Sequence, residues 1–210
     1  METIKINFKR PCKKEVDLIV NFLNRGQVIV YPTDTIYGLG CLATDRKAIR
    51  RIFKIKRREK RKPLLVLVDS LKMVKKYCYV SKEQEKYLRK IWPIKTLSVF
   101  KGHRVSRARP VSVILKSRKK LPKELTGGKD GVAARLPKNN FLIKIIKKIG
   151  VPLVATSVNV SGEKNLYNVS NIEKYFKKHK PDLAADAGEL KGKPSRLIDL
   201  RNIDRIKIVR

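Results

Sequence analysis

Residues 27–64 read QVIVYPTDTIYGLGCLATDRKAIRRIFKIKRREKRKPL, and this stretch decides the fold. Gln27–Tyr31 is mostly β-branched and aromatic, which predicts a buried strand. Pro32 ends the strand because proline cannot donate to a sheet ladder. Four polar side chains follow at once, Thr33, Asp34, Thr35 and Tyr37. Gly38 and Gly40 then indicate a tight turn or the close approach of a ligand.

The second half of the stretch predicts a helix, a cationic loop and another strand. Asp45 is expected to cap a helix that runs to about Arg57. The basic loop, residues 56–63 (KRREKRKP), leads into a buried strand, Leu64–Val68. Ligands of open α/β sheets bind beyond the carboxyl ends of strands. A hydroxyl-rich loop near a cationic loop therefore indicates an anionic ligand.

The rest of the chain alternates predicted helices and strands without a repeat or a linker, which favours one α/β domain over residues 1–210. Strands expected at residues 96–100 and 111–116 can pair antiparallel, so we expect a twisted, mixed β-sheet flanked by helices. Helices are expected over about residues 14–24, 70–77, 81–91, 140–149 and 172–178. Further strands are expected over about residues 4–8, 132–136, 152–155, 197–200 and 206–209.

The chain is strongly basic, with 52 lysines and arginines against 18 aspartates and glutamates and a net charge of +34. Such a charge attracts polyanions and speeds their encounter, but it says nothing about fold. Two interpretations remain open: solvated lysines on helix faces, or a surface that binds a polyanion such as RNA. Few aromatic residues lie within the basic runs, which disfavours stacking of single-stranded bases.

Cysteines and histidines argue against several kinds of chemistry. Cys12, Cys41 and Cys78 have no CxxC spacing, which indicates a reducing compartment and argues against disulfides or structural zinc. His103 and His179 lie among Lys and Arg, which disfavours a histidine general base. The phosphate-binding patterns GxxxxGK[ST] and GxGxxG are absent. No apolar run could span a membrane and no signal-peptide core is present, so we expect a cytoplasmic protein.

Charged residues near the predicted strand ends have more than one interpretation. The basic loop could bind phosphates through Lys56, Arg58 and Lys62, since Arg offers a planar, two-pronged donor group and Lys a point charge. The same residues could equally form a solvated helix end. Asp34 could bind a metal or an amine, or could orient its own loop.

Three polar loops follow predicted strands, at residues 32–40, 126–131 and 156–162. Each alone is typical of an ordinary turn, so their joint order is what matters. The ordered segments are PTDTIYGLG (32–40), KRR (56–58) with PL (63–64), VAARLP (132–137), TSVNVSG (156–162) and PSRLIDL (194–200). With these segments the chain resembles the YrdC-like family, the threonylcarbamoyl-AMP synthases, in its short single-domain form. The likeness runs from about residue 13 to the C-terminus.

The resemblance implies a fold like that of DHBP synthase and site residues at matching positions. The residues expected to hold threonine are Thr35, Arg135, Ser157 and Ser195. The residues expected to hold ATP are Arg58, Lys62, Gly131, Asn159 and Arg210. Lys56 and Arg58 are expected to be the catalytic residues.

The resemblance also implies an activity. Such enzymes, which are nucleotidyltransferases, combine L-threonine, bicarbonate and ATP into threonylcarbamoyl-AMP and release pyrophosphate. A partner transferase then moves the threonylcarbamoyl group to a tRNA adenosine. Mg²⁺ is expected to accompany ATP with no protein metal site, and the basic surface leaves room for weak tRNA binding. Two alternatives remain, a divergent YrdC-like protein with another carbamoyl adenylate and a non-catalytic RNA-binding module.

Overall fold

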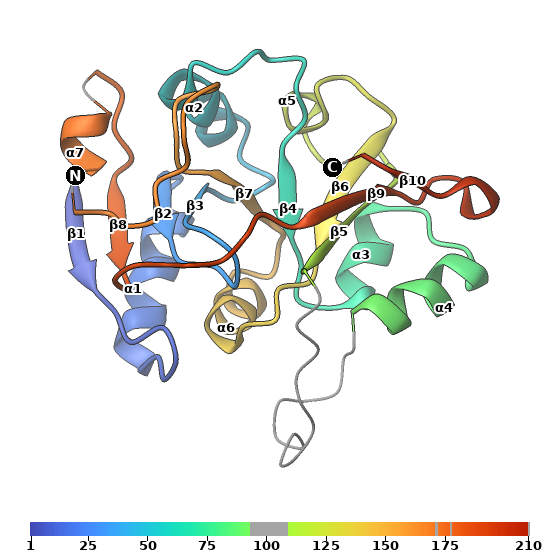
Figure 1. Cartoon of the computed structure of the whole chain (residues 1–210), viewed down its shortest axis with the longest axis horizontal. Helices are drawn as coiled ribbons and strands as arrows, with labels where there is room; N and C mark the ends of the chain where they lie inside the picture. Colours follow the sequence, from blue (N-terminus) through green and yellow to red (C-terminus); the bar gives the residue numbers. More distant parts are fainter. Residues whose placement is uncertain (93–108, 171, 177, 210) are drawn as a thin grey trace.

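The structure is a computed structural model that describes residues 1–92, 109–170, 172–176 and 178–209. Its helices and strands alternate along most of the chain (Figure 1). The strands are β1 (Glu2–Lys5), β2 (Ile29–Tyr31), β3 (Gly38–Gly40), β4 (Leu65–Leu67), β5 (Val111–Lys116), β6 (Gly131–Arg135), β7 (Leu153–Ser157), β8 (Leu183–Asp186), β9 (Arg196–Asp199) and β10 (Lys207–Ile208). The helices are α1 (Lys13–Asn24), α2 (Arg46–Lys56), α3 (Leu71–Tyr77), α4 (Lys82–Ile91), α5 (Lys123–Thr126), α6 (Asn140–Ile149) and α7 (Ile172–Tyr175), with a 3-10 turn, η1 (Ile203–Arg205).

The described strands form one sheet in the order β1-β8-β2-β3-β7-β4-β6-β5-β9-β10. Strand β8 pairs in parallel with β1 and β2, and the pairs β4–β6 and β5–β9 are also parallel. The remaining neighbours run antiparallel. The predicted mixed sheet is therefore confirmed.

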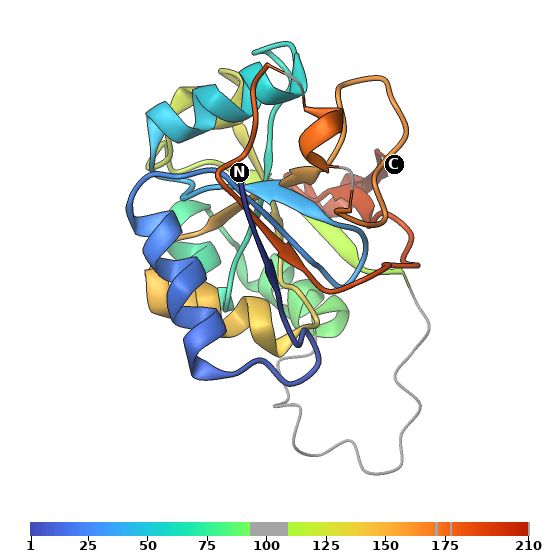
Figure 2. The same cartoon turned by 90° about the vertical axis from the view of Figure 1, so that its left-hand side faces the viewer.

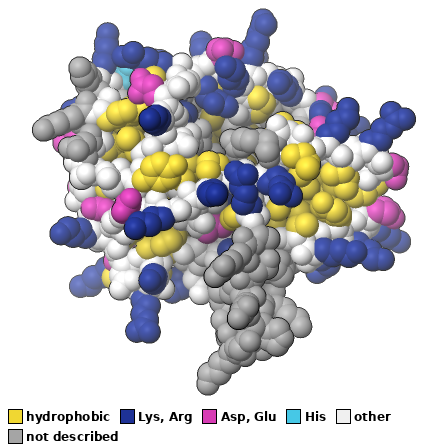
Figure 3. Space-filling view, viewed as in Figure 1, with side chains coloured by type: hydrophobic (Ala, Val, Ile, Leu, Met, Phe, Trp, Pro, Cys, Tyr) yellow, Lys and Arg dark blue, Asp and Glu magenta, His cyan; other side chains and the backbone are white. Residues whose placement is uncertain are grey.

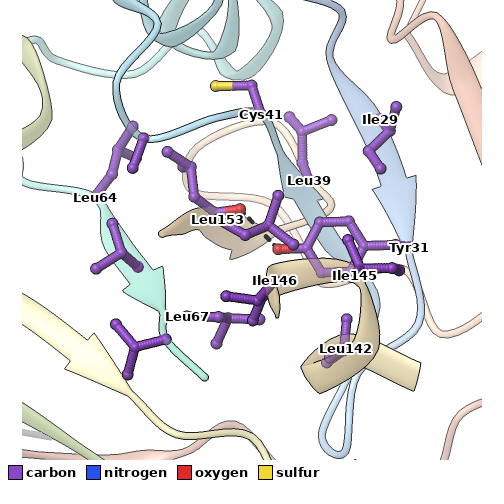
Figure 4. Packing of buried hydrophobic residues seen from close by; sticks show 14 of the residues in the cluster. Ile29, Tyr31, Leu39, Cys41, Leu64, Leu67, Leu142, Ile145, Ile146 and Leu153 are labelled. Carbon is purple, nitrogen blue, oxygen red and sulfur yellow. Dashed lines mark hydrogen bonds between the residues drawn. The ribbon is translucent and has the colours of Figure 1, made fainter. Parts of the chain in front are cut away.

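Helices cover the sheet unevenly. Figure 2 shows α1, α2 and α6 on one side of the sheet, while α7 lies on the other side. In the core, Leu142, Ile145 and Ile146 of α6 lie close to Tyr31 and Leu153 of the sheet (Figure 4). No helix in the described part of the chain is long and apolar enough to cross a membrane.

Several helices start at the predicted positions, where a side chain caps the first turn. The Asp45 carboxylate accepts a hydrogen bond from the Ala48 N–H at 2.9 Å, which caps α2. Ser81 and Gln84 form a capping box at the start of α4, and Ser70 caps α3. These caps satisfy N–H groups that have no partner within the helix.

Gly38 and Gly40 lie within strand β3, so of the two predicted alternatives the tight turn is wrong. A Cβ atom on Gly40 would lie 1.9 Å from the Val154 carbonyl oxygen and 2.9 Å from a ring carbon of Tyr31. The Tyr31 hydroxyl donates to the same Val154 oxygen at 2.7 Å, as Figure 4 shows. Gly40 is therefore required because the Val154 carbonyl oxygen, together with the Tyr31 ring, occupies the space that a Cβ atom would need.

Short strands account for most of the other differences from the sequence analysis. Strand β3 was not predicted because two of its three residues are glycines, which rarely favour a strand. Strand β8 has two alanines among four residues and is held by pairing with β1 and β2. Strand β1 begins and ends earlier than the predicted 4–8. The strand expected at residues 96–100 lies outside the described residues.

Helix α2 ends in a left-handed residue. Arg57 has φ 46° and is exposed, and the next N–H, that of Arg58, donates back to the Phe53 carbonyl at 3.0 Å. The Lys56 side chain before this turn is buried, whereas Arg58 after it is partly exposed. The strained residue therefore separates two cations that are close in sequence.

Arg57→Gly is expected to stabilise the fold. A left-handed backbone conformation costs a non-glycine residue about 1–2 kcal/mol. Substitution by glycine removes this cost, but glycine loses more conformational entropy on folding, which offsets part of the gain. The net gain of about 0.5–1 kcal/mol should raise Tm by about 1–4 °C in thermal unfolding. Lys54→Gly, at an exposed position inside the same helix, should instead destabilise the protein by about 1 kcal/mol. A lower Tm for Arg57→Gly would contradict this description of the helix end.

Candidate active site

A cleft of about 710 Å³ lies over one face of the sheet. Alternate residues of β6 line it, at positions 131, 133 and 135, as expected when successive side chains of a strand point to opposite faces. The loop after β2, the basic loop and the segment before β9, which crosses in front of the sheet in Figure 1, also line it. The cleft is thus on the sheet face and not only beyond the strand ends. The predicted site residues that it brings together are Thr35, Arg58, Lys62, Gly131, Arg135, Ser157 and Ser195.

A buried guanidinium lies in the lining of this cleft. Arg135 is 3% exposed, and its Nη2 forms an ion pair with Asp34 Oδ1 at 3.1 Å. Its Nη1 donates to Thr35 Oγ1 at 3.2 Å, while Nε has no hydrogen-bond partner among the described residues. The other Asp34 oxygen accepts from the Lys138 N–H at 3.2 Å. Of the two interpretations of Asp34, the structure favours the one in which Asp34 orients its own loop.

Hydroxyl groups from distant segments surround the same cleft. Thr35 Oγ1 lies 2.7 Å from Thr33 Oγ1, and both threonines are buried. Ser195 Oγ lies 2.8 Å from the Oγ of Ser112, which is also buried. Ser157 Oγ donates to Asn159 Oδ1 at 2.7 Å. Donors and acceptors of this kind can position a small polar ligand.

The basic loop places two cations at the edge of the cleft. Arg58 donates from Nε to the Lys62 carbonyl at 3.3 Å and from Nη2 to the Pro63 carbonyl at 3.0 Å. Lys62 forms an ion pair with Glu59 at 2.9 Å, and both side chains are largely exposed to solvent. Such an exposed pair contributes little to stability, so Lys62 can exchange Glu59 for an anionic ligand at small cost.

Two further cations line the cleft that the sequence analysis did not assign. Lys129 comes from the glycine-rich turn before β6, and Arg201 follows β9. Arg201 forms an ion pair with Asp199 at 2.5 Å and lowers the pKa of that carboxyl. Neither cation lies in a segment quoted for the family resemblance, so their place in the cleft emerges only from the fold.

Lys56 and Asn159, predicted as catalytic and ATP-binding residues, do not line the cleft. The Lys56 side chain is buried, with the residue 1% exposed, and Nζ donates to Ser157 O at 2.5 Å, Asn159 O at 2.8 Å and Asn159 Oδ1 at 2.6 Å. The backbone of Ser161 in turn donates to the Lys56 carbonyl. Burial lowers the pKa of the Lys56 amine to about 7, and the Arg58 charge acts in the same direction. Lys56 therefore holds the end of β7 and the loop that follows it.

Gly131 and Arg210 are two more residues that were predicted to contact ATP. Gly131 lines the cleft, but a Cβ atom there would lie 2.9 Å from Ile114 Cγ2, so strand packing alone already calls for glycine. Arg210 lies outside the described residues, although the preceding Val209 lines the cleft. Within the part of the chain that the structure describes, no group of three or more His, Cys, Asp or Glu is placed to hold a metal ion.

The fold and the site together define an α/β protein with a cationic cleft on the face of a mixed sheet. Residues 21–210 match the Sua5/YciO/YrdC family, which is described as Telomere recombination. The chain belongs to this family, and the predicted YrdC-like resemblance is confirmed.

Relatives of known name match most of the chain. The threonylcarbamoyl-AMP synthase of Pyrococcus abyssi is 28% identical over 201 residues, which cover 94% of this chain and 54% of that protein. A Methanocaldococcus jannaschii protein, provisionally given the same name, is 32% identical over 200 residues, covering 94% of this chain and 86% of that protein. The structure of P. abyssi Sua5 complexed with L-threonine matches with a TM-score of 0.85 at 26% identity, over 100% of this chain and 57% of that chain. This chain thus spans little more than half of the P. abyssi protein.

The buried Lys56 should make stability depend on pH in a defined direction. Its folded-state pKa of about 7 lies below the ordinary 10.5, so above pH 7 the unfolded state binds more protons and stability rises with pH. Relative to Lys56→Met, the wild-type unfolding free energy should increase by about 2 kcal/mol from pH 7 to pH 9 in urea titrations.

The matched control is Lys54→Met, at an exposed position of the same helix, which should show no such pH-dependent difference. A constant difference between wild type and Lys56→Met across this range would mean that the three acceptors keep the amine protonated despite its burial.

Proposed function

We propose that the chain is a threonylcarbamoyl-AMP synthase, a nucleotidyltransferase acting on L-threonine, bicarbonate and ATP. Family membership and the names of the relatives support this function. The single observation that carries it is the buried Arg135, whose Nε–H lacks a partner among the described residues, in a cleft that is also lined by further cations. A buried guanidinium of this kind can receive a carboxylate in addition to Asp34.

Threonine would bind at the Arg135 end of the cleft. Its carboxylate would meet the guanidinium and the hydroxyl of Thr35, while Ser157 and Ser195 would contact its polar side chain or amine. The P. abyssi Sua5 structure complexed with L-threonine supports a threonine site in this fold. Each charge-assisted hydrogen bond in such a site contributes about 1.5–3 kcal/mol.

ATP would bind along the basic side of the cleft. Arg58, Lys62 and Lys129 would hold its phosphates, and the backbone at Gly131 would lie near the nucleotide. Arg210 remains a proposed contact because Val209 already lines the cleft. Asn159 would act indirectly, since its amide holds Ser157 and Lys56.

The reaction joins three anions, whose repulsion the cleft must offset. In the first step the threonine nitrogen bonds to the bicarbonate carbon and water leaves, which gives a carbamate. A carbamate oxygen then attacks the α-phosphorus of ATP, and pyrophosphate leaves. Cations such as Arg58 would stabilise the charge that develops on the phosphates, and one shared cleft removes the entropy cost of a three-body encounter. Lys56 would act as a positioning residue, through the loop after β7.

Mg²⁺ would enter with ATP. The cleft carboxylate Asp199 is paired with Arg201, and the other residues proposed to contact the phosphates are cations. The triphosphate would supply most of the ligands, and the ion would neutralise phosphate charge. The product would pass to a partner transferase that acts on tRNA.

Pyrophosphate release from ATP is the direct test of this function. Release should require both threonine and bicarbonate when each is left out in turn. Arg58→Ala should reduce it at least about 100-fold, because its guanidinium would contact the reacting phosphates. Arg61→Ala, an exposed residue of the same loop that does not line the cleft, should retain nearly full activity.

Turnover by Arg58→Ala at the wild-type rate would remove Arg58 from the mechanism. Pyrophosphate release that is indifferent to threonine but dependent on another amino acid would indicate a divergent member of the family with a different carbamoyl adenylate.

A further inference from the structure

Two of the hydroxyl groups proposed to bind threonine have a second hydroxyl directly behind them. Thr35 Oγ1 lies 2.7 Å from Thr33 Oγ1, and Ser195 Oγ lies 2.8 Å from the Oγ of Ser112. Thr33 belongs to a segment quoted for the family resemblance, whereas Ser112 belongs to none of these segments. Ser112 therefore has a place next to the proposed site that the sequence did not indicate.

Ser112 is a buried hydroxyl in an apolar part of the sheet. It is 0% exposed in β5, between the partly buried Val111 and the fully buried Val113. Ile114, two residues further along the strand, lines the cleft, so Ser112 points toward the same face of the sheet. A buried hydroxyl without a hydrogen bond is costly. Within the described ranges, the partner of the Ser112 hydroxyl is Ser195.

Backbone pairing holds the two serines side by side. Strands β5 and β9 run in parallel with Ser112 opposite Leu197, and the Arg196 N–H donates to the Pro110 carbonyl at 2.8 Å. Ser195 immediately precedes β9 and is itself only 6% exposed. The sheet therefore brings the two hydroxyls together as the protein folds, before any ligand binds.

The Ser112 hydroxyl can fix the direction of the Ser195 hydroxyl. A serine hydroxyl has one proton and two lone pairs, and it rotates to suit its partners. At 2.8 Å from Ser112, the Ser195 hydroxyl is restrained whichever of the two serines donates. A group that is already held in its bound orientation loses less entropy when a ligand arrives.

Directed hydroxyls suit a cleft that must select one amino acid. Figure 3 shows Lys and Arg side chains near the middle of the face that the segment before β9 crosses in Figure 1, with hydrophobic side chains to both sides. Positive charge attracts small anions of many kinds. Hydrogen-bonding groups held in fixed directions discriminate better, because an analogue that lacks the matching group leaves them unpaired.

We propose that Ser112 is a positioning residue for threonine binding and that it acts through Ser195. The inference rests on the proposed function, in which Ser195 contacts threonine. Ser112 does not line the cleft, so it acts without touching the ligand. Its hydroxyl holds the Ser195 hydroxyl in the direction that threonine requires.

Isothermal titration calorimetry with L-threonine tests this role with two substitutions of nearly equal shape. Ser112→Val removes the hydroxyl, while Ser112→Thr keeps it and adds one methyl group. Ser112→Val should weaken threonine binding about 3- to 10-fold, as expected for the loss of one neutral hydrogen bond, and Ser112→Thr should weaken it less than about twofold. Ser112→Ala adds no atoms, should behave as Ser112→Val, and keeps the test decisive if the larger residues do not fit.

Pyrophosphate release distinguishes a positioning role from a general disturbance of the strand. The hydrogen bond between the serines is the same before and during the reaction, so its loss should affect binding rather than turnover. The KM for L-threonine should rise about as much as the dissociation constant, while kcat and the KM for ATP stay nearly unchanged.

A double-variant cycle tests whether Ser112 acts through Ser195. Ser195→Ala removes the group that Ser112 holds, so adding Ser112→Ala should change threonine affinity by less than about 1.5-fold. The matched control is Ser117→Ala, another buried serine just beyond β5, which does not line the cleft and whose Oγ accepts from the Lys119 N–H at 3.0 Å. This control should bind L-threonine as the wild type does.

Equal threonine affinities of Ser112→Val and Ser112→Thr would overturn the proposal. So would effects of Ser112→Ala and Ser195→Ala that multiply, or equal weakening of threonine and ATP binding. If the wild-type protein binds no L-threonine, the proposed function fails together with this inference. If the wild type binds L-threonine and the Ser112 variants bind it equally well, only this inference fails.

Discussion

The ion pair between Arg135 and Asp34 is the constraint on which the rest of the site depends. Arg135 belongs to a central strand and is almost fully buried, so its charge must be paired inside the protein. An uncompensated buried charge would cost several kcal/mol. The pairing fixes the polar loop after β2 against β6 and places the Thr35 hydroxyl on the guanidinium. Nε remains buried without a partner among the described residues, so the guanidinium that organises the loop keeps one unsatisfied N–H.

A second buried cation, Lys56, holds the end of β7 and the loop that follows it. Lys56 meets no carboxylate, and its amine is satisfied by two backbone carbonyls and one side-chain oxygen of the loop after β7. The left-handed turn at Arg57 lets Lys56 face inward while Arg58 reaches the cleft. The two basic residues therefore have different roles: Lys56 supports the structure, and Arg58 is a candidate contact for phosphate.

Sequence patterns predicted the parts of this protein that depend on local chemistry. The cap at Asp45, the capping box at Ser81 and the mixed sheet follow from residue types and spacing. Strands β3 and β8 escaped prediction because glycine and alanine gain their strand geometry from neighbours far away in the chain. In the site, the fold brings seven of the predicted residues into one cleft, but the motifs could not distinguish Arg58, which lines it, from the buried Lys56, which does not. Lys129 lies in a polar loop that the sequence indicated, but neither it nor Arg201 could be assigned to the cleft, because only the folded chain brings them there.

The central claim is that Arg135 anchors the carboxylate of an amino acid within this cleft. Isothermal titration calorimetry of the wild-type protein with L-threonine and with L-threoninol, which replaces the carboxylate by an alcohol, tests it most directly. Changing the ligand avoids the destabilisation that removal of a buried arginine would cause. We predict saturable binding of L-threonine and at least about tenfold weaker binding of L-threoninol, because charge-assisted hydrogen bonds are lost. Equal affinities, or no binding of L-threonine, would contradict the account.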